Sequence, residues 1–414
     1  MGSFWESASE NLQHAAKALN LAPEMIDLLK EPMRMEEFQI PLRMDNGKMR
    51  VFMAYRAYHN DALGPSGGGV RISPTLTPEE VKALALTMTI KWSTVGLPMG
   101  GSKGGIVANP RELSPWEYEQ LCREYVRRVG FTGAWIDNLA ADMGTNTTAT
   151  GWMLDEYERR VGHHSPASII DKPTLLRGTV GVEDQVAQGI RFLTRQVAMD
   201  MNFEPAKTDV VIQGFGAVGK STAITLAKEG YKIIAIGDVY GSIINRNGID
   251  VAKLVEHFKK TGTIVGFEGA QAIENKDELL ELECDILIPG ALQNVITEEN
   301  ADRIKAKVVI QGANGPVTPE ADKIMTDKGI IDVPDVIANA GGIMINAFER
   351  TQGFTEEFWD EDRVHKAMDK LMTNAYREAI ATSKEYNVSL TEAAWINGLK
   401  RVSAALRARC SAWV

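Results

Sequence analysis

The chain has 414 residues, 44% hydrophobic and 24% charged, which is long enough for two domains with separate cores. Its formal net charge of −10 argues against nucleic acid as a main partner, since nucleic-acid binding favours a basic face. No stretch is apolar enough to span a membrane, and the three cysteines, Cys122, Cys284 and Cys410, have no metal-binding spacing. We therefore expect a reduced, cytoplasmic protein with no membrane partner and no metal site.

The first part of the chain shows helix, hairpin and loop signals in turn. Apolar residues recur with helical spacing over residues 8–30 and stop before Pro32, which predicts a helix there. Residues 37–58 alternate as strands do around Asp45-Asn46-Gly47, a hairpin signal. The glycine-rich segment Gly64–Arg71 then predicts a loop.

A helix is predicted to begin at Thr77 and Pro78, which supply a capping side chain and a proline in the first turn. Lys91 lies on the apolar face of this helix, seven residues after Leu84. A buried lysine needs an anionic partner, unless its stem carries the amine to water. The helical pattern alone leaves both interpretations open.

The most informative lysine lies in a run of glycines, Met99-Gly-Gly-Ser-Lys103-Gly-Gly105. Glycine has no side chain, so a small molecule could approach Lys103 closely. Asp142 follows in a segment of small residues, where it could serve as an acid or simply cap a helix. An amine and a carboxylate in one site suggest chemistry that moves protons.

From Thr208 onward, apolar strands alternate with helices, which predicts a doubly wound parallel sheet. Beyond Gly342 the chain is predicted to be helical to its end. The five expected strands lie at 209–212, 232–236, 285–288, 307–310 and about 330–333.

A glycine loop between the first two of these strands carries the spacing typical of dinucleotide binding. Gly214 would make the tight turn, Gly216 would admit a pyrophosphate, and Gly219 would allow close packing of helix and sheet. Asp238 follows the next strand, where it would accept hydrogen bonds from a ribose and repel a 2′-phosphate. This favours NAD over NADP, although Lys220 and Arg246 leave NADP possible. The loop residues expected at the cofactor are Gly214, Phe215, Gly216, Ala217, Val218 and Gly219.

With these motifs in order, the chain resembles the glutamate dehydrogenase family, which includes the leucine, phenylalanine and valine dehydrogenases. The resemblance runs along almost the whole chain. The matching segments are Gly64-Pro65, Gly68 to Arg71, Met88 to Lys91, Leu97 to Gly105, Asp142 to Thr145, Gly214 to Gly219, Gly312 to Pro316 and Asn339 to Gly342.

The resemblance implies an α/β fold of two domains, a substrate and oligomerisation domain and a Rossmann-type nucleotide domain. By this comparison, residues 1–184 with the C-terminal helices 345–414 form the first domain, and residues 185–344 form the second. The site is expected in the cleft between them. The family also implies a homohexamer as the assembly.

The family's reaction is the NAD(P)-dependent oxidative deamination of an L-amino acid to a 2-oxo acid and ammonium, and its reverse. By resemblance, Lys91 would bind the substrate α-carboxylate and Lys103 would polarise the carbonyl and hold the attacking water. Asp142 would move protons to and from the amine. A depressed pKa of Lys103 would suit its role.

The remaining expected contacts also come from the resemblance. Asn314 and Asn339 would position the nicotinamide end and the substrate amine, and Ala291 is expected at the cofactor. Gly67, Gly68 and Asn346 are expected at the substrate.

The chain departs from the family pattern at four positions. Glutamate-specific members carry a lysine for the substrate γ-carboxylate where this chain has Gly67, and a serine where it has Asn346. Val182 and Val186 replace an arginine and a threonine that precede the nucleotide domain. We expect Gly67 to leave a vacant volume and the pocket to favour a neutral or bulkier side chain, although glutamate is the family default.

Three functional hypotheses follow. The first is an NAD-dependent amino-acid dehydrogenase, acting on glutamate or on a neutral or bulkier side chain. The second is an oxidoreductase that uses Lys103 and Asp142 on a related amine or oxo compound. The third is a catalytically silent paralogue that binds nucleotide and regulates a partner hexamer. The presence of Lys91, Lys103 and Asp142 together speaks against the third.

Overall fold

The computed structural model describes residues 4–410, which belong to two compact units. Unit 1 comprises Met1–Val182, Ile343–Val364 and Trp395–Val414, and unit 2 comprises Glu183–Gly342 and His365–Ala394. Residues 365–394 thus group with unit 2, whereas the sequence comparison assigned all of 345–414 to the first domain. The reason is that this segment bonds to the helix over 185–201: Tyr376 donates to Asp200, and Arg195 pairs with Asp369.

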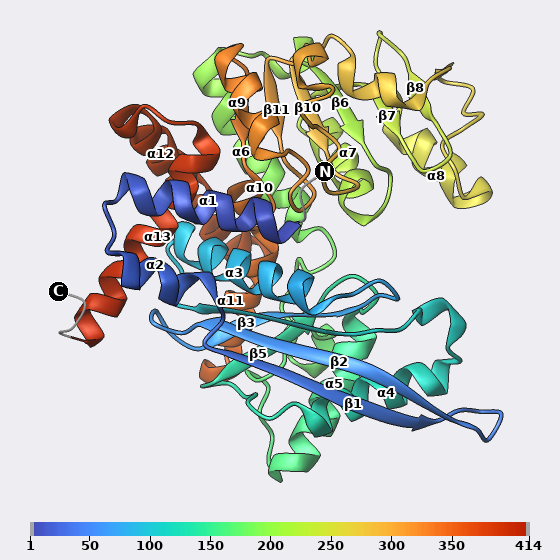
Figure 1. Cartoon of the computed structure of the whole chain (residues 1–414). Coiled ribbons are helices and arrows are strands. Elements are labelled where there is room, and N and C mark those ends of the chain that lie inside the picture. The colour runs from blue at the N-terminus through green and yellow to red at the C-terminus, as the bar shows by residue number, and fades with distance from the viewer. Residues whose placement is uncertain (1–3, 411–414) are drawn as a thin grey trace. The chain divides into compact units, whose positions relative to one another are not determined.

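Unit 1 is built on a five-stranded sheet with the order β1-β2-β4-β3-β5 (Figure 1). β1 pairs antiparallel with β2, and β2 pairs antiparallel with β4. The β1–β2 connection is the predicted hairpin, in which Gly47 adopts the left-handed φ of 78°. β3 runs parallel to both β4 and β5. The strands are β1 (Arg34–Arg43), β2 (Met49–Asn60), β3 (Ser66–Ile72), β4 (Gly100–Ile106) and β5 (Asp137–Ala141).

Two of these strands occupy glycine-rich segments, one of which predicted a loop and the other room for a ligand. β3 and β4 are buried along their whole length, because other parts of unit 1 press against the glycines. A Cβ atom on Gly101 would lie 2.2 Å from the backbone nitrogen of Thr89, and one on Gly104 would lie 2.0 Å from the Tyr125 hydroxyl. The expectation that the run around Lys103 leaves room for a ligand is therefore wrong at these glycines, which serve close packing.

The helices of unit 1 begin and end largely at local signals. The predicted helix over 8–30 is two helices, because Asn20 turns the chain with a φ of 48° and Pro23 starts a new helix. Thr77 caps the next helix by accepting the Glu80 backbone N–H at 3.2 Å, as predicted. The helices are α1 (Phe4–Ala18), α2 (Pro23–Lys30), α3 (Pro78–Thr94), α4 (Pro115–Arg128), α5 (Thr147–Val161), α11 (Gly341–Thr355) and α13 (Leu390–Arg409), with 3₁₀ turns η1 (Pro110–Glu112) and η2 (Thr174–Leu176).

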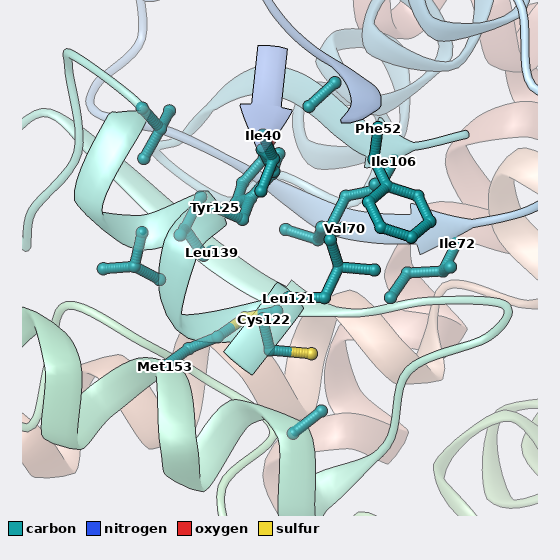
Figure 2. Packing of buried hydrophobic residues seen from close by; sticks show 14 of the residues in the cluster. Ile40, Phe52, Val70, Ile72, Ile106, Leu121, Cys122, Tyr125, Leu139 and Met153 are labelled. Atoms are coloured by element: carbon teal, nitrogen blue, oxygen red, sulfur yellow. The ribbon is translucent and has the colours of Figure 1, made fainter. Parts of the chain in front are cut away.

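The core of unit 1 lies between its sheet and the helices α4 and α5. Figure 2 shows side chains of β1 to β5, among them Ile40, Val70 and Leu139, gathered beside Leu121 and Met153. All five of these side chains have no measurable solvent exposure. Burial of such residues stabilises the sheet that carries Lys103 and Asp142.

Unit 2 contains a seven-stranded sheet with the order β12-β11-β10-β6-β7-β8-β9. The first five strands in this order are parallel, which confirms the predicted doubly wound core. β8 and β9 add an antiparallel edge that the sequence did not predict. The strands are β6 (Asp209–Gln213), β7 (Lys232–Gly237), β8 (Ser242–Ile244), β9 (Gln271–Ile273), β10 (Ile286–Pro289), β11 (Val308–Ile310) and β12 (Ile331–Val333).

The helices of unit 2 include α6, which packs on α7, the helix that follows the glycine loop. Among the described helices of the chain, none combines the length and the apolar character needed to cross a membrane. The helices are α6 (Gln185–Met201), α7 (Ala217–Lys228), α8 (Val251–Thr261), α9 (Pro319–Asp327), α10 (Asp335–Ala338) and α12 (Glu361–Tyr386), with 3₁₀ turns η3 (Pro205–Lys207), η4 (Lys276–Glu281) and η5 (Ala301–Arg303).

Candidate functional site

Lys103, which is buried, and Asp142, which is partly buried, form an ion pair in unit 1. The Lys103 Nζ atom on β4 lies 2.9 Å from Asp142 Oδ1, directly after β5. The other carboxylate oxygen of Asp142 accepts a hydrogen bond from Arg71 Nε at 2.7 Å, and Arg71 also pairs with Glu80 at 2.6 Å. Gly69 allows this approach, because a Cβ atom there would lie 2.7 Å from the Asp142 Cβ.

The charges around this pair shift both pKa values. Burial lowers the pKa of Lys103; Asp142 opposes this, while Arg71 and Lys91 add to it. Burial by itself would raise the pKa of Asp142, but Lys103 and Arg71 outweigh it and lower that pKa to about 2. The carboxylate is therefore ionised at neutral pH, and the lysine gives up its proton more easily than an exposed lysine does.

Lys91 lies on α3 with only 6% of its surface exposed, which confirms that this residue is on the buried face. Its charge contributes to the lowered pKa of Lys103. A cluster of Lys91, Lys103 and Arg71 with Asp142 and Glu80 holds three cationic and two anionic side chains. Lys91, Lys103 and Arg71 thus lie close together in unit 1, and cations of this kind suit an anionic ligand such as a carboxylate.

The space in front of Gly67 is filled by protein side chains. A Cβ atom on Gly67 would lie 3.0 Å from Met99 Cε and 3.4 Å from the Trp92 ring. The Trp92 indole N–H also donates to the Gly67 carbonyl oxygen at 3.1 Å. The expected vacant volume is therefore absent, and Gly67 is covered by an indole and a thioether.

Gly68 is a packing glycine in this structure. A Cβ atom there would lie 1.8 Å from the Ser102 carbonyl oxygen, so any larger residue would push β3 away from β4. Its carbonyl oxygen accepts a hydrogen bond from the buried Arg56, which pairs with Asp137 at 2.8 Å.

Asn346 lies on α11 and interacts with Asp171, a residue that the sequence analysis did not single out. Asp171 Oδ2 accepts the Ala141 backbone N–H at 3.1 Å, directly before Asp142. Burial and the nearby Glu349 raise the pKa of Asp171 to about 7. No local motif marks this residue, because its position depends on a contact between segments 30 residues apart.

The glycine loop of unit 2 has the geometry expected of a dinucleotide site. Gly214 has a φ of 102°, and a Cβ atom on Gly219 would lie 1.9 Å from the Gly214 carbonyl oxygen. A Cβ atom on Gly216 would meet nothing within 4 Å, so the space before the α7 N-terminus is open. A pyrophosphate fits there, because the first turn of a helix offers backbone N–H donors.

The other predicted loop residues take different places. The Phe215 side chain is only 2% exposed and packs edge-on against Phe258, so only its backbone faces the loop. Ala217 is exposed and Val218 is half-buried in the first turn of α7. Ala291 packs against Gly214, with its Cβ 3.0 Å from the position of a Cβ on that glycine.

Asp238 is engaged by its own loop. Its Oδ1 atom accepts the backbone N–H groups of Tyr240 and Gly241 at 2.7 and 3.0 Å. Its Oδ2 atom accepts the Thr263 hydroxyl at 2.8 Å and the Ile264 N–H at 2.9 Å. The carboxylate therefore shapes the end of β7, and its negative charge remains at the place where a ribose is expected.

Asn339 and Asn314 are in contact in unit 2. The Asn339 side-chain amide donates to Asn314 Oδ1 at 2.9 Å and to the Ala313 carbonyl oxygen at 3.1 Å. Val186, one of the two valines that depart from the family pattern, lies in the first turn of α6 within the same unit. Val182 lies at the end of the first segment of unit 1.

Comparison with known families identifies two matching regions. Residues 178–410 match the family described as glutamate/leucine/phenylalanine/valine dehydrogenase. Residues 32–159 match the family described as the Glu/Leu/Phe/Val dehydrogenase dimerisation domain.

Individual relatives cover nearly the whole chain. The chain is 42% identical to the NAD-specific glutamate dehydrogenase of Staphylococcus aureus, over 96% of each chain. It is 40% identical to the glutamate dehydrogenase of Thermotoga maritima, over 98% of each chain. The hetero-hexameric glutamate dehydrogenase of Thermus thermophilus, solved in a leucine-bound form, is 29% identical with a TM-score of 0.93, covering 98% of this chain and 97% of that one.

Proposed function

The chain belongs to the glutamate/leucine/phenylalanine/valine dehydrogenase family, and we propose that it catalyses the NAD-dependent oxidative deamination of an L-amino acid and the reverse reductive amination. The observation that carries this proposal is the buried contact between Lys103 and Asp142. A nucleotide-binding paralogue without activity would not need an ionised acid and a lysine of lowered pKa side by side.

Residues of unit 1 supply the acid–base chemistry. We propose that Lys91 binds the substrate α-carboxylate, since it is a buried cation close enough to Lys103 to lower the pKa of that lysine. Lys103 holds the attacking water and polarises the substrate carbonyl, and its lowered pKa eases the loss of a proton. Asp142, held by Lys103 and Arg71, accepts and returns the proton of the substrate amine.

Residues of unit 2 would hold the cofactor. When bound, NAD accepts the hydride from the substrate α-carbon. The open space at Gly216 and the α7 N-terminus suit the pyrophosphate, and Asp238 carries the charge that disfavours a 2′-phosphate. Asn314 and Asn339, which contact each other, would position the nicotinamide end and the substrate amine.

The direct test is a panel of 2-oxo acids assayed with ammonium and NADH, read by the loss of NADH absorbance. We expect turnover with at least one 2-oxo acid and release of NADH in the reverse direction from the corresponding L-amino acid. The absence of turnover across carboxylate, branched, aromatic and amide side chains would overturn the proposal. NADH binding without turnover would instead favour a regulatory paralogue.

We also propose a homohexamer in the cytoplasm. The matched dimerisation domain supports self-assembly, as does β1, an edge strand of its sheet next to the exposed apolar residues Met49 and Val51. The hetero-hexameric Thermus protein supports an assembly of six subunits. The buried thiols of Cys122 and Cys284 are unpaired, which suits a reducing compartment. Light scattering on the purified chain tests the assembly.

A further inference from the structure

Asp171 is held in an unusual backbone conformation beside the Lys103–Asp142 pair. Its φ is +61°, a left-handed value that few residues other than glycine, asparagine and aspartate adopt. Its backbone N–H donates to Glu349 at 3.2 Å, and its carbonyl oxygen accepts the Thr150 hydroxyl at 2.7 Å. These contacts fix the peptide on both sides, so the direction of the side chain is set by the fold.

The Asp171 carboxylate is buried but incompletely hydrogen-bonded. Asp171 is only 4% exposed, and its Oδ2 atom accepts the Ala141 backbone N–H. The Oδ1 atom has no hydrogen-bond partner among the described residues. The Asn346 Oδ1 atom, on the neighbouring amide, is also buried without a donor. The Asn346 side chain hydrogen-bonds to Asp171, yet each of the two side chains keeps one buried acceptor oxygen without a donor, which costs free energy unless a ligand or water supplies one.

The charges next to Asp171 leave it uncompensated. Lys172 and Glu349 form an ion pair in which both side chains are fully buried, so each neutralises the other. Lys172 Nζ also donates to the Ile169 carbonyl oxygen at 2.7 Å. Within residues 4–410, no lysine or arginine forms an ion pair with Asp171 itself, so this buried carboxyl, whose pKa burial and Glu349 raise to about 7, has no cation paired to it. Asp142 and Arg71, by contrast, are ion-paired in the cluster around Lys103.

We propose that Asp171 and Asn346 form a subsite for a positively charged, hydrogen-bond-donating group on the substrate's side chain, so that the enzyme acts on a short diamino acid. This inference rests on the proposed dehydrogenase function and names its substrate class. The cluster around Lys103 receives the α-carboxylate, and Asp171, which bonds to the residue directly before Asp142, receives the distal ammonium.

The same geometry disfavours a side-chain carboxylate at this subsite. A carboxylate offers only acceptors, and it would face Asp171 Oδ1 and Asn346 Oδ1, which are acceptors as well. The wall at Gly67, formed by the Trp92 ring and Met99, offers apolar contact to a methylene stem and no cation. A like-charge contact of this kind costs several-fold to a thousand-fold in affinity, roughly 1–4 kcal/mol.

The test compares amino acids of matched shape in the oxidative direction with NAD. L-Ornithine and L-norleucine have side chains of equal length that differ in the terminal ammonium, and L-glutamate and L-glutamine differ in the terminal charge. We expect the wild-type kcat/KM for L-ornithine or the shorter L-2,4-diaminobutyrate to exceed those for L-norleucine and L-glutamate by about 10-fold or more. Asparagine tolerates the left-handed backbone, so Asp171→Asn tests the charge alone. This variant should lower kcat/KM for the diamino acid by roughly 30-fold or more and change kcat/KM for L-norleucine by less than about 3-fold.

Asp332→Asn is the matched control, because Asp332 is a buried acid of raised pKa in unit 2. This control should leave the ratio of kcat/KM for L-ornithine to kcat/KM for L-norleucine unchanged. A wild-type preference for L-glutamate would overturn the proposal of a cation subsite. An equal loss of kcat/KM on all substrates in Asp171→Asn would also overturn it. If no amino acid reduces NAD, the proposed function fails. Thermal stabilisation by L-ornithine over L-norleucine, lost in Asp171→Asn, then still decides whether the subsite binds a cation.

Discussion

The ammonium nitrogen of Lys103 lies 2.9 Å from Asp142 Oδ1; the Lys103 side chain is buried and that of Asp142 is partly buried. The two groups come from different strands, β4 and the end of β5, which are held on either side of β3. A base and an acid at this distance can exchange protons with a ligand placed between them, provided that the ligand displaces part of their own contact. Both pKa values are lowered, and the surrounding cations, Lys103 first and then Arg71, keep Asp142 ionised.

Removal of either member of this pair should abolish turnover. We expect Lys103→Ala and Asp142→Asn each to reduce kcat by about 10²–10⁴-fold, the usual contribution of general acid–base catalysis. NADH binding should stay nearly intact, because the cofactor residues belong to unit 2. Steady-state kinetics and the fluorescence of bound NADH measure the two effects. Substantial activity in either variant would mean that other residues carry the chemistry.

NAD should be preferred over NADP by kcat/KM. The reason is the negative charge of Asp238 at the end of β7, which repels a 2′-phosphate. Asp238→Ser should narrow the preference, but it should also lower Tm, because the carboxylate accepts four hydrogen bonds from residues of its own loop and of 263–264. Asp250→Ser, which removes a carboxylate from the N-cap of α8 in the same unit and leaves a capping hydroxyl, is the control for loss of charge and should not change the cofactor ratio. A clear NADP preference in the wild type would refute the assignment.

A lysine at position 67 should raise the efficiency on 2-oxoglutarate, since it supplies a cation for the γ-carboxylate. The Met99 methyl group lies 3.0 Å from where its Cβ would be, so Gly67→Lys should work better together with Met99→Ala. Asn346→Ser can be added to shorten the neighbouring amide. We expect a gain of roughly 10-fold or more in kcat/KM on 2-oxoglutarate. If the wild type already prefers 2-oxoglutarate to oxo acids with uncharged side chains, the pocket binds the γ-carboxylate without a lysine at position 67, contrary to this prediction.

Stability should depend on pH through two buried carboxyl groups of unit 2. Burial raises the pKa of Asp322 from 3.8 to about 6 and also raises that of Asp332. At pH values between the unfolded pKa of 3.8 and the raised folded pKa, the folded state binds more protons than the unfolded state. The two carboxyl groups therefore contribute less stability as pH rises from about 4 through 6. Asp332→Asn should therefore gain a few degrees in Tm over the wild type at about pH 8 and less at about pH 5.

Thermal unfolding at both pH values checks this expectation. Asp327→Asn is the matched control, because Asp327 is an exposed acid on α9, the helix that carries Asp322. A Tm difference between Asp332→Asn and wild type that is equal at both pH values would show that the two carboxyl groups do not titrate as their burial indicates.

Some features of this protein follow from its sequence alone. The hairpin at Gly47, the cap at Thr77 and the glycine loop at Gly214 were predicted and are present, because each depends on residues within a few positions of one another. The alternation of strands and helices from Thr208 likewise predicted the parallel core of unit 2. The motifs also predicted the family.

Other features depend on contacts between distant segments, which local patterns do not encode. The glycines of β3 predicted a loop and those of β4 predicted room for a ligand, yet both segments form buried strands. Ser102 presses against Gly68 of β3, and Thr89 and Tyr125 press against glycines of β4. The antiparallel edge of β8 and β9 was missed because strands of three residues carry too little periodicity.

The surroundings of the site were decided by the tertiary structure. Trp92 and Met99 cover Gly67, where the sequence predicted vacant space, because packing of α3 on the sheet brings them there. Asp171 reaches the backbone of Ala141 only because α11 holds its segment through Glu349. Residue identity thus determined which chemical groups are available, and long-range packing determined which of them meet, since a side chain's partners in a folded core come from segments far apart in the chain.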